Sequence, residues 1–418
     1  MASSDGQTAS HVEACERLER WMPRAVRGVV EKLAQKGARA VLVGGGVRDA
    51  FLDREPPDWD VATDALPSDV AGWFPRVVRA GEKHGTIMVL TGPMPVEVTT
   101  FRGEGPYLDG RRPSHVTFLK DLTADLARRD LTINAIAYDV VAKTIVDPFD
   151  GESDLHAGVV RAVGDAAARF SEDGLRPLRA LRFAATLGFE VEQGTRAALE
   201  SAYATFARVA WERKKVEMEK LLGNGVELVA PVAMLFESGM LEHLAPELTT
   251  TRNVDQLLQL PRDAMLRLAG WVVLAKRVPQ DAAAIVKRWR ASVSDAERVS
   301  KAVNAFQTKP DPTSLVALRR WVSKNDWAAA RDAATLEGLF DKARLTSELD
   351  ALAAQKPPLA IADLAVDGSE LESLGMRGPM VGIVLRQLLE KVLENPEINE
   401  KTTLRATALT LSTGIMSG

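Results

Sequence analysis

The stretch ARAVLVGGGVRDAFLDREPPDWDVAT, residues 38–63, decides how the first part of the chain folds. The apolar run at 38–45 ends in three glycines, which predicts a short buried strand followed by a tight turn. The segment 48–53 is expected to be a helix, and DWDVAT at 58–63 a second strand. A helix between two strands indicates a mixed α/β unit.

Outward from this stretch, the apolar spacing predicts one helix over 12–36 and another over 67–75. The runs TIMVL at 86–90 and VEVTTF at 96–101 are expected to be a third and a fourth strand. From about residue 122 the spacing becomes helical and stays so. The predicted fold class is an α+β N-terminal domain with a small mixed sheet, followed by an all-α remainder of several helical domains.

The domain boundaries follow from the same pattern and from Pro and Gly punctuation. We expect an N-terminal helix at 1–37, a head at 38–155, a helical neck at 156–225, a helical body at 226–350 and a helical tail at 351–418.

Composition limits the class of protein. Of the 418 residues, 46% are hydrophobic and 26% charged, which is typical of a soluble globular protein. No apolar run approaches the ~20 residues that span a bilayer, and a single cysteine favours the reducing cytoplasm. The net charge of −4 argues against a broad, sequence-independent nucleic-acid binder. It leaves room for an RNA enzyme with a local basic stripe.

Two carboxylates form a candidate metal site. Asp58 and Asp60 flank Trp59, and residues two apart on a strand point to the same face. Mg²⁺ prefers hard oxygen ligands and commonly joins one or two carboxylates to substrate phosphates. Glu97, on a later strand, is a candidate third carboxylate. Taken alone, the acid pair is more typical of an ordinary surface turn than of a metal site.

The glycine turn about ten residues earlier strengthens the interpretation. Gly44 and Gly45 allow a backbone to approach phosphate closely, and Arg48 adds a positive charge. A glycine-rich turn close to an acid pair predicts a compact site for a triphosphate and a metal ion. The glycines lack the GxGxxG spacing of a dinucleotide-binding turn.

These motifs resemble those of a known family. The turn and the acid pair resemble the signature of polymerase-beta-like nucleotidyltransferases and, more narrowly, of class II tRNA CCA-adding enzymes and bacterial poly(A) polymerases. Further segments are similar in the same order: Arg128-Arg129-Asp130-Leu131-Thr132-Ile133-Asn134-Ala135, Asp147-Pro148 with Gly151 and Asp154, Arg161-Ala162-Val163-Gly164-Asp165, Glu172-Asp173-Gly174-Leu175-Arg176, and Glu212-Arg213 with Glu217 and Lys220.

The resemblance implies an enzyme that adds the 3′-terminal CCA to tRNA from CTP and ATP. It implies that Asp58 and Asp60 hold Mg²⁺, and that Arg129, Asp130 and Asn134 lie against the sugar and phosphates of the incoming nucleotide. The expected partners are tRNA, CTP and ATP, with no membrane involved.

Asp173 and Arg176 are the candidate pair for nucleobase selection. Residues three apart on a helix share a face. A carboxylate accepts from an exocyclic amino group and a guanidinium donates to a ring nitrogen or a carbonyl, so the pair would accept C and A and reject U and G. The alternative is an ordinary salt bridge. Pro177 places the helix start near 173–176. Arg179 and Arg182 continue the face, to contact phosphates or to order Asp173.

Two further sets of charged residues are expected to contact substrates. We interpret 102–120 as a mobile loop; by the resemblance it assists the switch from C to A, and the alternative is a merely flexible surface loop. Trp289 and Trp321 are expected to lie in the core. The loop candidates are Arg102, Glu104, Asp109, Arg111 and Arg112, and the tRNA candidates are Lys287, Arg288, Arg290, Arg319, Arg320 and Arg377.

Other functions remain open at this stage. Within the class, these are an enzyme that adds only CC or only A, and a poly(A) polymerase. Outside it, the alternative is a non-catalytic RNA-binding protein descended from the same fold. Intact Asp58, Asp60, Asp173 and Arg176 argue against the last.

Overall fold

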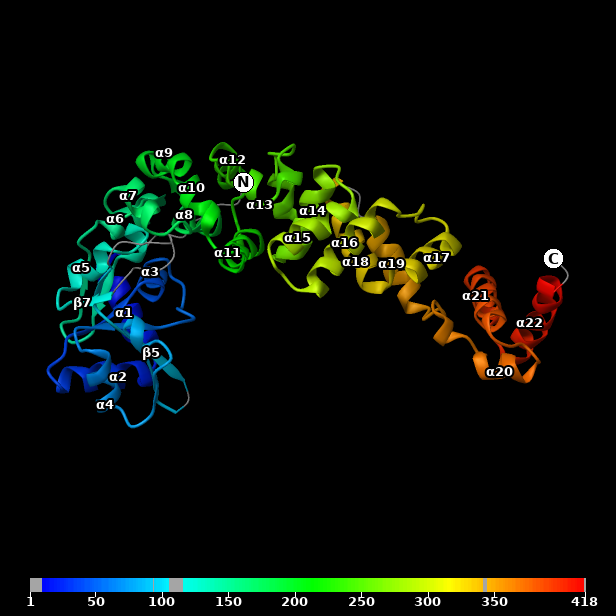
Figure 1. Cartoon of the computed structure of the whole chain (residues 1–418), viewed down its shortest axis with the longest axis horizontal. Helices are drawn as coiled ribbons and strands as arrows, with labels where there is room; N and C mark the ends of the chain where they lie inside the picture. Colours follow the sequence, from blue (N-terminus) through cyan, green and yellow to red (C-terminus); the bar gives the residue numbers. More distant parts are fainter. Residues whose placement is uncertain (1–9, 93, 105–115, 341–343, 417–418) are drawn as a thin grey trace. The chain divides into compact units, whose positions relative to one another are not determined.

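The chain divides into two compact units, Met1–Arg252 and Asn253–Gly418. The first unit holds a sheet with helices around it, and the second is helical (Figure 1). This confirms the predicted fold class. The division falls inside the segment 226–350, which the sequence assigns to one helical body. The computed structural model describes residues 10–92, 94–104, 116–340 and 344–416.

One sheet dominates the first unit. Its strands include all four predicted from the sequence; Thr86–Leu90 has the predicted ends, and the other three differ from the prediction by one or two residues at an end. Over the described part of the chain, the seven strands of this sheet are, in spatial order, β3 (Val77–Val78), β4 (Thr86–Leu90), β5 (Pro95–Thr100), β2 (Asp60–Thr63), β1 (Ala40–Val43), β8 (Ala137–Asp139) and β9 (Thr144–Val146).

The sheet is mixed, as predicted. β2 runs parallel to β5, and the other neighbouring pairs are antiparallel. The expectation of unbroken helix beyond residue 122 is wrong, because β8 and β9 lie at 137–146. Ala137 and Tyr138 are both fully buried. A strand buried on both faces shows no alternation of apolar and polar residues, so its pattern does not differ from that of a buried helix.

The helix predicted at 12–36 is in fact two helices, α1 (His11–Trp21) and α2 (Arg24–Gln35). Pro23 separates them. Proline has no N–H and disfavours helical backbone in the residue before it, so Met22 leaves the helix with a ψ of 118°. Periodicity alone could not show this break, because the buried faces of both helices keep nearly the same register.

Helices surround the sheet and continue beyond it in the first unit (Figure 1). The helix α8 (Arg176–Leu187) packs against α11 (Trp211–Asn224) and α12 (Val229–Glu237). The remaining helices of this unit are α3 (Gly45–Phe51), α4 (Pro67–Trp73), η1 (Glu82–His84), α5 (Leu122–Ala127), η2 (Thr132–Asn134), α6 (Gly151–Ala157), α7 (Ala166–Glu172), α9 (Gln193–Ser201), α10 (Tyr203–Arg208), α13 (Met240–Leu244) and η3 (Pro246–Leu248).

Apolar side chains fix the central strands against α5. Val41 and Val43 of β1 and Ala62 of β2 share one buried cluster with Leu122 and Leu126. Successive residues of a strand point to opposite faces, so Val41 and Val43 lie on the same face of β1. A two-stranded parallel sheet, β10 (Val159–Val160) with β11 (Glu190–Val191), lies beyond this core.

The segment interpreted as a mobile loop has an ordered base. Arg102–Glu104 (β6) pairs in antiparallel fashion with Val116–Phe118 (β7). The backbone N–H of Arg102 also donates to Asp125 Oδ1 (3.1 Å). The loop interpretation is therefore wrong for these two ends. Asp109, Arg111 and Arg112 lie outside the described residues.

The second unit is built from helices, and two buried clusters of its described residues lie among them. α21 contributes to both, with Leu393 in one cluster and Leu388 in the other. No helix of the described residues is long and apolar enough to cross a membrane. The helices are η4 (Asp255–Gln259), α14 (Ala264–Leu274), α15 (Pro279–Arg288), α16 (Val293–Gln307), α17 (Leu315–Asn325), α18 (Trp327–Glu337), η5 (Gly338–Phe340), α19 (Arg344–Ala354), η6 (Ile361–Asp363), α20 (Gly368–Ser373), α21 (Pro379–Glu394), η7 (Pro396–Ile398) and α22 (Lys401–Met416).

Candidate functional site

The glycine turn joins β1 to α3. Gly44 has φ 76° and ψ −133°, a backbone conformation that glycine adopts without steric cost. A Cβ atom on Gly44 would lie 3.1 Å from Arg129 Nη1 and 3.8 Å from Asp60 Oδ2. The turn therefore brings bare backbone between a guanidinium and a carboxylate.

The acidic residues lie beside this turn. β2 begins at Asp60, so Asp58 precedes the strand and is not part of it. Trp59 is buried, whereas Asp58 and Asp60 are exposed. The parallel pairing of β2 with β5 sets Asp60 opposite Glu97.

The surroundings of these carboxylates raise the pKa values of Asp60 and Glu97. Loss of solvation is the largest cause that raises the pKa of Asp60; Arg129 lowers that pKa and Asp58 raises it. Desolvation, followed by the charge of Asp60, raises the pKa of Glu97, and Arg102 lowers it. The acids therefore repel one another.

This set of oxygen atoms suits Mg²⁺. Carboxylates that disfavour each other's charge bind a proton or a cation more readily. Mg²⁺ takes one or two carboxylates and completes its shell with water and phosphate oxygens. Across the ranges that the structure describes, no three His, Cys, Asp or Glu side chains form a ready-made metal-ligand cluster. Asp58 and Asp60 fit an ion of the kind that shares its shell with phosphates.

A chain of hydrogen bonds joins α3 to α8. Arg48 Nη1 donates to Asn134 Oδ1 (2.7 Å), and Asn134 Nδ2 donates to Asp130 Oδ1 (3.2 Å). Arg179 Nε donates to the other oxygen of Asp130 (2.8 Å). Burial opposes ionisation of Asp130, but Arg179 and Asn134 hold its pKa well below the ordinary value. Four predicted nucleotide-binding residues thus form one network.

Arg129 lies beside this network. Burial lowers the pKa of its guanidinium, and Asp125 opposes that effect. Its Nη1 donates to the backbone oxygen of Asn134 (3.4 Å), and its Nε atom is buried without a hydrogen-bond partner. A buried donor without a partner is costly, so Arg129 retains capacity to bind an anion.

The expectation that Asp173 and Arg176 share a helix face is wrong. α7 ends at Glu172 and α8 begins at Arg176, which confirms the predicted helix start. Asp173 lies between them in extended conformation. A Cβ on Gly174 would lie 2.4 Å from the backbone oxygen of Thr205. The close passage of that backbone requires a glycine and a turn here.

The two side chains have separate partners. The Asp173 carboxylate accepts from Arg213 Nη1 (3.1 Å) and Nη2 (2.6 Å). Arg176 is buried; it donates to Glu172 and to the backbone oxygens of Arg169 and Arg128. An i,i+3 salt bridge between Asp173 and Arg176 is therefore not what the structure has.

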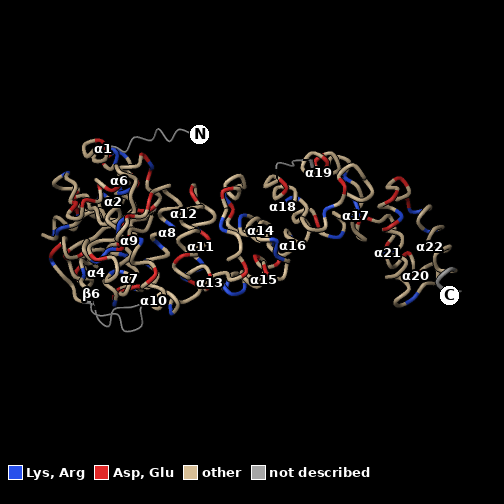
Figure 2. The backbone as a smooth tube through the Cα atoms, turned by 90° about the horizontal axis from the view of Figure 1, so that it is seen from above, with Lys and Arg blue, Asp and Glu red and all other residues tan. Residues whose placement is uncertain are grey.

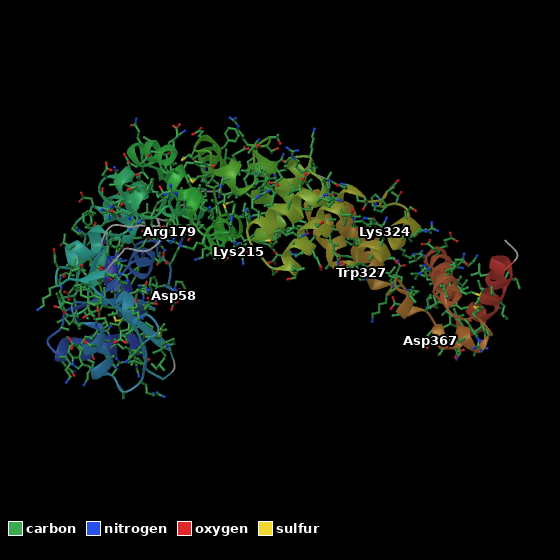
Figure 3. All side chains as sticks on the ribbon, in the orientation of Figure 1. Asp58, Arg179, Lys215, Lys324, Trp327 and Asp367 are labelled. Carbon is green, nitrogen blue, oxygen red and sulfur yellow. The ribbon has the colours of Figure 1, made fainter. Side chains whose placement is uncertain are left out.

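Sequence reasoning did not find two partners on α11. Arg213 holds Asp173, and Glu217 accepts from Arg182 Nε (2.8 Å) and Arg179 Nη1 (3.5 Å). The only sign in the sequence that Arg213 and Glu217 belong to the site is the resemblance of Glu212-Arg213 with Glu217 to a family motif. Asp58, before β2, and Arg179, on α8, are labelled in Figure 3.

Arg102 and Glu104 of the predicted loop lie on β6. Arg102 donates to the backbone oxygen of His84, and its charge lowers the pKa of Glu97. These contacts place Arg102 at the base of the hairpin, close to the acidic residues.

The tRNA candidates in the second unit are of two kinds. Arg319 is buried and donates to the backbone oxygens of Leu393 (2.5 Å) and Glu394 (3.2 Å). Its assignment as a surface RNA contact is wrong, because it caps the end of α21. Trp289 and Trp321 are buried, as expected. Lys287, Arg290, Arg320 and Arg377 are exposed and Arg288 is half-buried.

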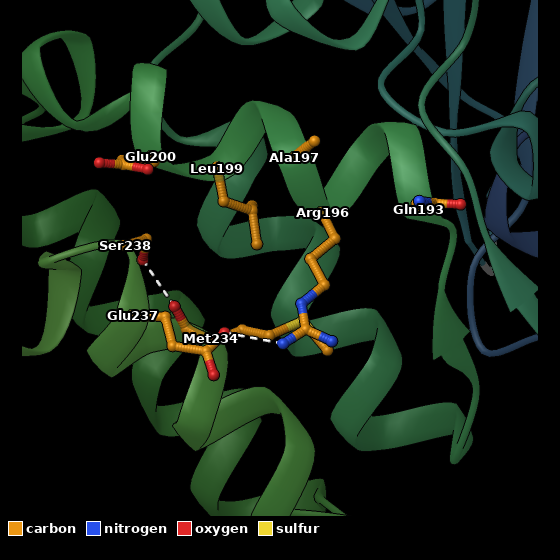
Figure 4. A pocket seen from close by; sticks show the side chains of 8 residues that line it. All are labelled: Gln193, Arg196, Ala197, Leu199, Glu200, Met234, Glu237 and Ser238. Carbon is orange, nitrogen blue, oxygen red and sulfur yellow. Dashed lines mark hydrogen bonds and ion pairs between the residues drawn. The ribbon is translucent and has the colours of Figure 1, made fainter.

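A cavity of about 420 Å³ lies between α9 and α12 (Figure 4). Arg196 Nη2 and Glu237 Oε2 pair within it at 2.9 Å. These two charged groups thus already have partners, and the lining includes none of the candidate site residues.

The fold and the site together define a class. A mixed sheet presents two carboxylates beside a glycine turn, and the neighbouring helices supply guanidinium groups. Such an arrangement suits a divalent ion and a nucleoside triphosphate and is typical of the nucleotidyltransferases.

Comparisons with known proteins narrow the class. Residues 40–161 match the poly A polymerase head domain, and residues 188–251 match the probable RNA and SrmB-binding site of polymerase A. The CCA-adding enzyme of Lacticaseibacillus paracasei is 35% identical over 406 residues, which cover 95% of this chain and 99% of the relative. That of Lactiplantibacillus plantarum is 35% identical over 390 residues, 91% of this chain and 94% of the relative.

A solved structure agrees with these relatives. The crystal structure of the Bacillus stearothermophilus CCA-adding enzyme in complex with CTP is 29% identical and superposes with a TM-score of 0.82. The match covers 95% of this chain and 100% of that one. The chain belongs to the family of CCA-adding enzymes.

Proposed function

We propose that this protein adds or restores the 3′-terminal CCA of tRNA, taking C from CTP and A from ATP without a nucleic-acid template. One observation carries the proposal: the acid pair at 58–60 lies beside the Gly44 turn, in a chain that is similar to CCA-adding enzymes over 95% of its length. The absence of a membrane-spanning helix among the described residues is consistent with our placing the reaction in the cytoplasm.

In this reaction, the 3′-hydroxyl oxygen of the RNA forms a bond to the α-phosphorus of the nucleotide, and the bond to pyrophosphate breaks. Asp58 and Asp60 would hold Mg²⁺, which activates the hydroxyl and steadies the leaving pyrophosphate. The bare backbone of Gly44 gives the phosphates room. The unpaired Nε of Arg129 supports a role as an anion-binding donor.

We propose that Asp173 and Arg176 select the nucleobase. Asp173 would accept from the exocyclic amino group of C or A, and Arg176 would donate to the ring nitrogen beside it. Both side chains have internal partners, so base binding must exchange part of the contacts with Arg213 and Glu172 for contacts with the base. A wrong base would leave buried polar groups unpaired, at about 1–3 kcal/mol each.

A direct assay tests the function. Transfer RNA that lacks CCA is incubated with each nucleotide alone and with CTP and ATP together. We expect growth by three residues, and only with both nucleotides. Addition that stops at CC, or A alone on tRNA ending in CC, would indicate a partial enzyme. Long A tracts on any RNA would indicate a poly(A) polymerase.

A substitution tests the acid pair. Asp58→Asn is expected to abolish nucleotide addition and to leave tRNA affinity nearly intact, because the amide loses the charge that holds the ion. Asp69→Asn changes an exposed aspartate on α4 and serves as the matched control. Cellular function that is unchanged by Asp58→Asn would favour the non-catalytic RNA-binding alternative.

A second substitution tests base selection. Asp173→Ala is expected to raise incorporation of U and G relative to C and A more than it weakens triphosphate binding. Incorporation of all four nucleotides is measured on the same tRNA. An unchanged preference for C and A would contradict the role of Asp173.

The exposed cations Lys287, Arg290, Arg320 and Arg377, with Arg288, remain candidates for tRNA contact. Phosphate contacts make the affinity depend on salt. Replacing a contacting cation by alanine would weaken binding and reduce that dependence.

A further inference from the structure

Phe183 on α8 lies at the centre of a cluster of arginines. Its ring is almost fully buried. Within the described residues, the guanidinium carbons of Arg182, Arg48 and Arg179 lie 3.5, 4.9 and 5.6 Å from the ring centroid. A cation within about 6 Å of a ring centroid is attracted to the π face. One ring therefore holds guanidiniums from two helices, α3 and α8.

The charges of the cluster are already balanced. Arg48 donates to Asp49, Arg179 to Asp130, and Arg182 to Glu217. The ring is therefore not needed to neutralise charge. The ring instead orients the guanidinium groups. Because they are already held against the ring, they lose little conformational entropy when an anion binds.

The cluster adjoins the glycine turn. Arg48 Nη2 lies 3.6 Å from the position of a Cβ on Gly45. Arg179 is the most open of the three cations, with 32% of its side chain exposed, against 12% for Arg48 and 11% for Arg182. An anion beside the turn thus lies close to Arg48. Asn134 and Asp130 connect Arg48 to Arg179, and the ring of Phe183 keeps the arginine cluster in one arrangement.

We propose that Phe183 is a positioning residue for the triphosphate: its ring presets Arg48 and Arg179 for binding the phosphates of either nucleotide. The proposal rests on the function proposed above. It differs from base selection, since the phosphates are common to CTP and ATP. Loss of the π face should therefore change the KM for both nucleotides equally and leave the choice of base unchanged.

Phe183→Leu removes the π face and keeps an apolar side chain. We expect KM for CTP and for ATP to rise together by about tenfold, with kcat largely kept. Discrimination against U and G should not change. The affinity for tripolyphosphate, which carries neither base nor sugar, should fall by the same factor. Phe170→Leu is the control, because Phe170 is equally buried and the described residues place no guanidinium over its ring.

A fluorinated series at position 183 separates the π face from simple packing. Successive ring fluorination weakens the π face with little change in volume, so log KM should rise steadily across the series. Flat KM values, or a Phe183→Leu variant whose KM is unchanged, would overturn the proposal. Because tripolyphosphate binding is measured directly, the test holds even if wild-type protein fails to extend tRNA. That failure would contradict the proposed function instead.

Discussion

The two units use charged side chains differently. In the first unit, the carboxylates of Asp130 and Glu217 have side chains no more than 10% exposed, and both pair with arginines that lie 35 to 49 residues away in the sequence. In the second unit, Arg320 pairs with Glu390 and Glu394, whose side chains are 60% and 58% exposed. Acidic and basic residues are spread along both units in Figure 2, so the presence of charged residues alone does not distinguish the two units.

Burial is what distinguishes them. Removing one partner of a buried pair leaves an uncompensated charge in a poorly hydrated place, whereas an exposed charge is solvated by water. The first unit therefore uses buried ion pairs to fix the geometry of a site, whereas the ion pairs of Arg320 in the second unit lie at its surface.

The largest expected effect is at Glu217. Glu217→Ala leaves Arg182 buried without its carboxylate partner, and we expect the first unit to lose about 3–5 kcal/mol of unfolding free energy. Urea denaturation followed by circular dichroism measures this loss. Glu394→Ala, the matched change in the second unit, should not shift its transition. Equal losses for both variants would remove the distinction between the units.

The next largest effect is expected at Lys214, which should make the unfolding free energy depend on pH. Burial lowers the pKa of this lysine to about 8. Its Nζ atom donates to the backbone oxygen of Ala207 (3.1 Å) and contacts His243 Nε2 (2.8 Å). The rings of Phe206 and Trp211 lie close to the same atom. The folded state releases its proton at lower pH than the unfolded chain, so folding should gain stability as pH rises from about 8 to 10.5.

The measurement is the difference in unfolding free energy between wild type and Lys214→Met at several pH values. This difference cancels the titration of other groups. We expect it to shift in favour of wild type by up to about 3 kcal/mol across that window. A difference that does not vary with pH would show that the aromatic contacts fully stabilise the charged form.

Arg319 is an exception within the second unit, because it is buried there. Arg319→Met keeps the apolar stem but leaves two carbonyl groups at the end of α21 without their donor. We expect a loss of about 1–2 kcal/mol in unfolding free energy. Affinity for tRNA and its salt dependence should stay unchanged, whereas Arg377→Ala tests an exposed cation in the same assay. Reduced salt dependence for Arg319→Met would restore it as an RNA contact.

The smallest effect is expected for Arg320→Ala. Its partners Glu390 and Glu394 are solvated, so the denaturation midpoint of the second unit should not change measurably. A clear decrease would show that the contact between α17 and α21 depends on this ion pair.

The sequence predicted what depends on neighbours along the chain. The Gly44 turn, the exposed acids around Trp59 and the start of α8 beside Pro177 each follow from a few consecutive residues. The predictions failed where burial hides the pattern, as in β8, or where a proline interrupts a register that continues across it, as between α1 and α2.

By itself the sequence thus determined the fold class, the glycine turn, the acid pair and the family, because local backbone preferences and residue spacing carry them. Only the tertiary structure decided the partners: Arg213 for Asp173, Glu217 for Arg182, and the end of α21 for Arg319. These contacts join segments 35 to 74 residues apart. A charged side chain has many possible partners along a chain, and only packing selects which one it meets.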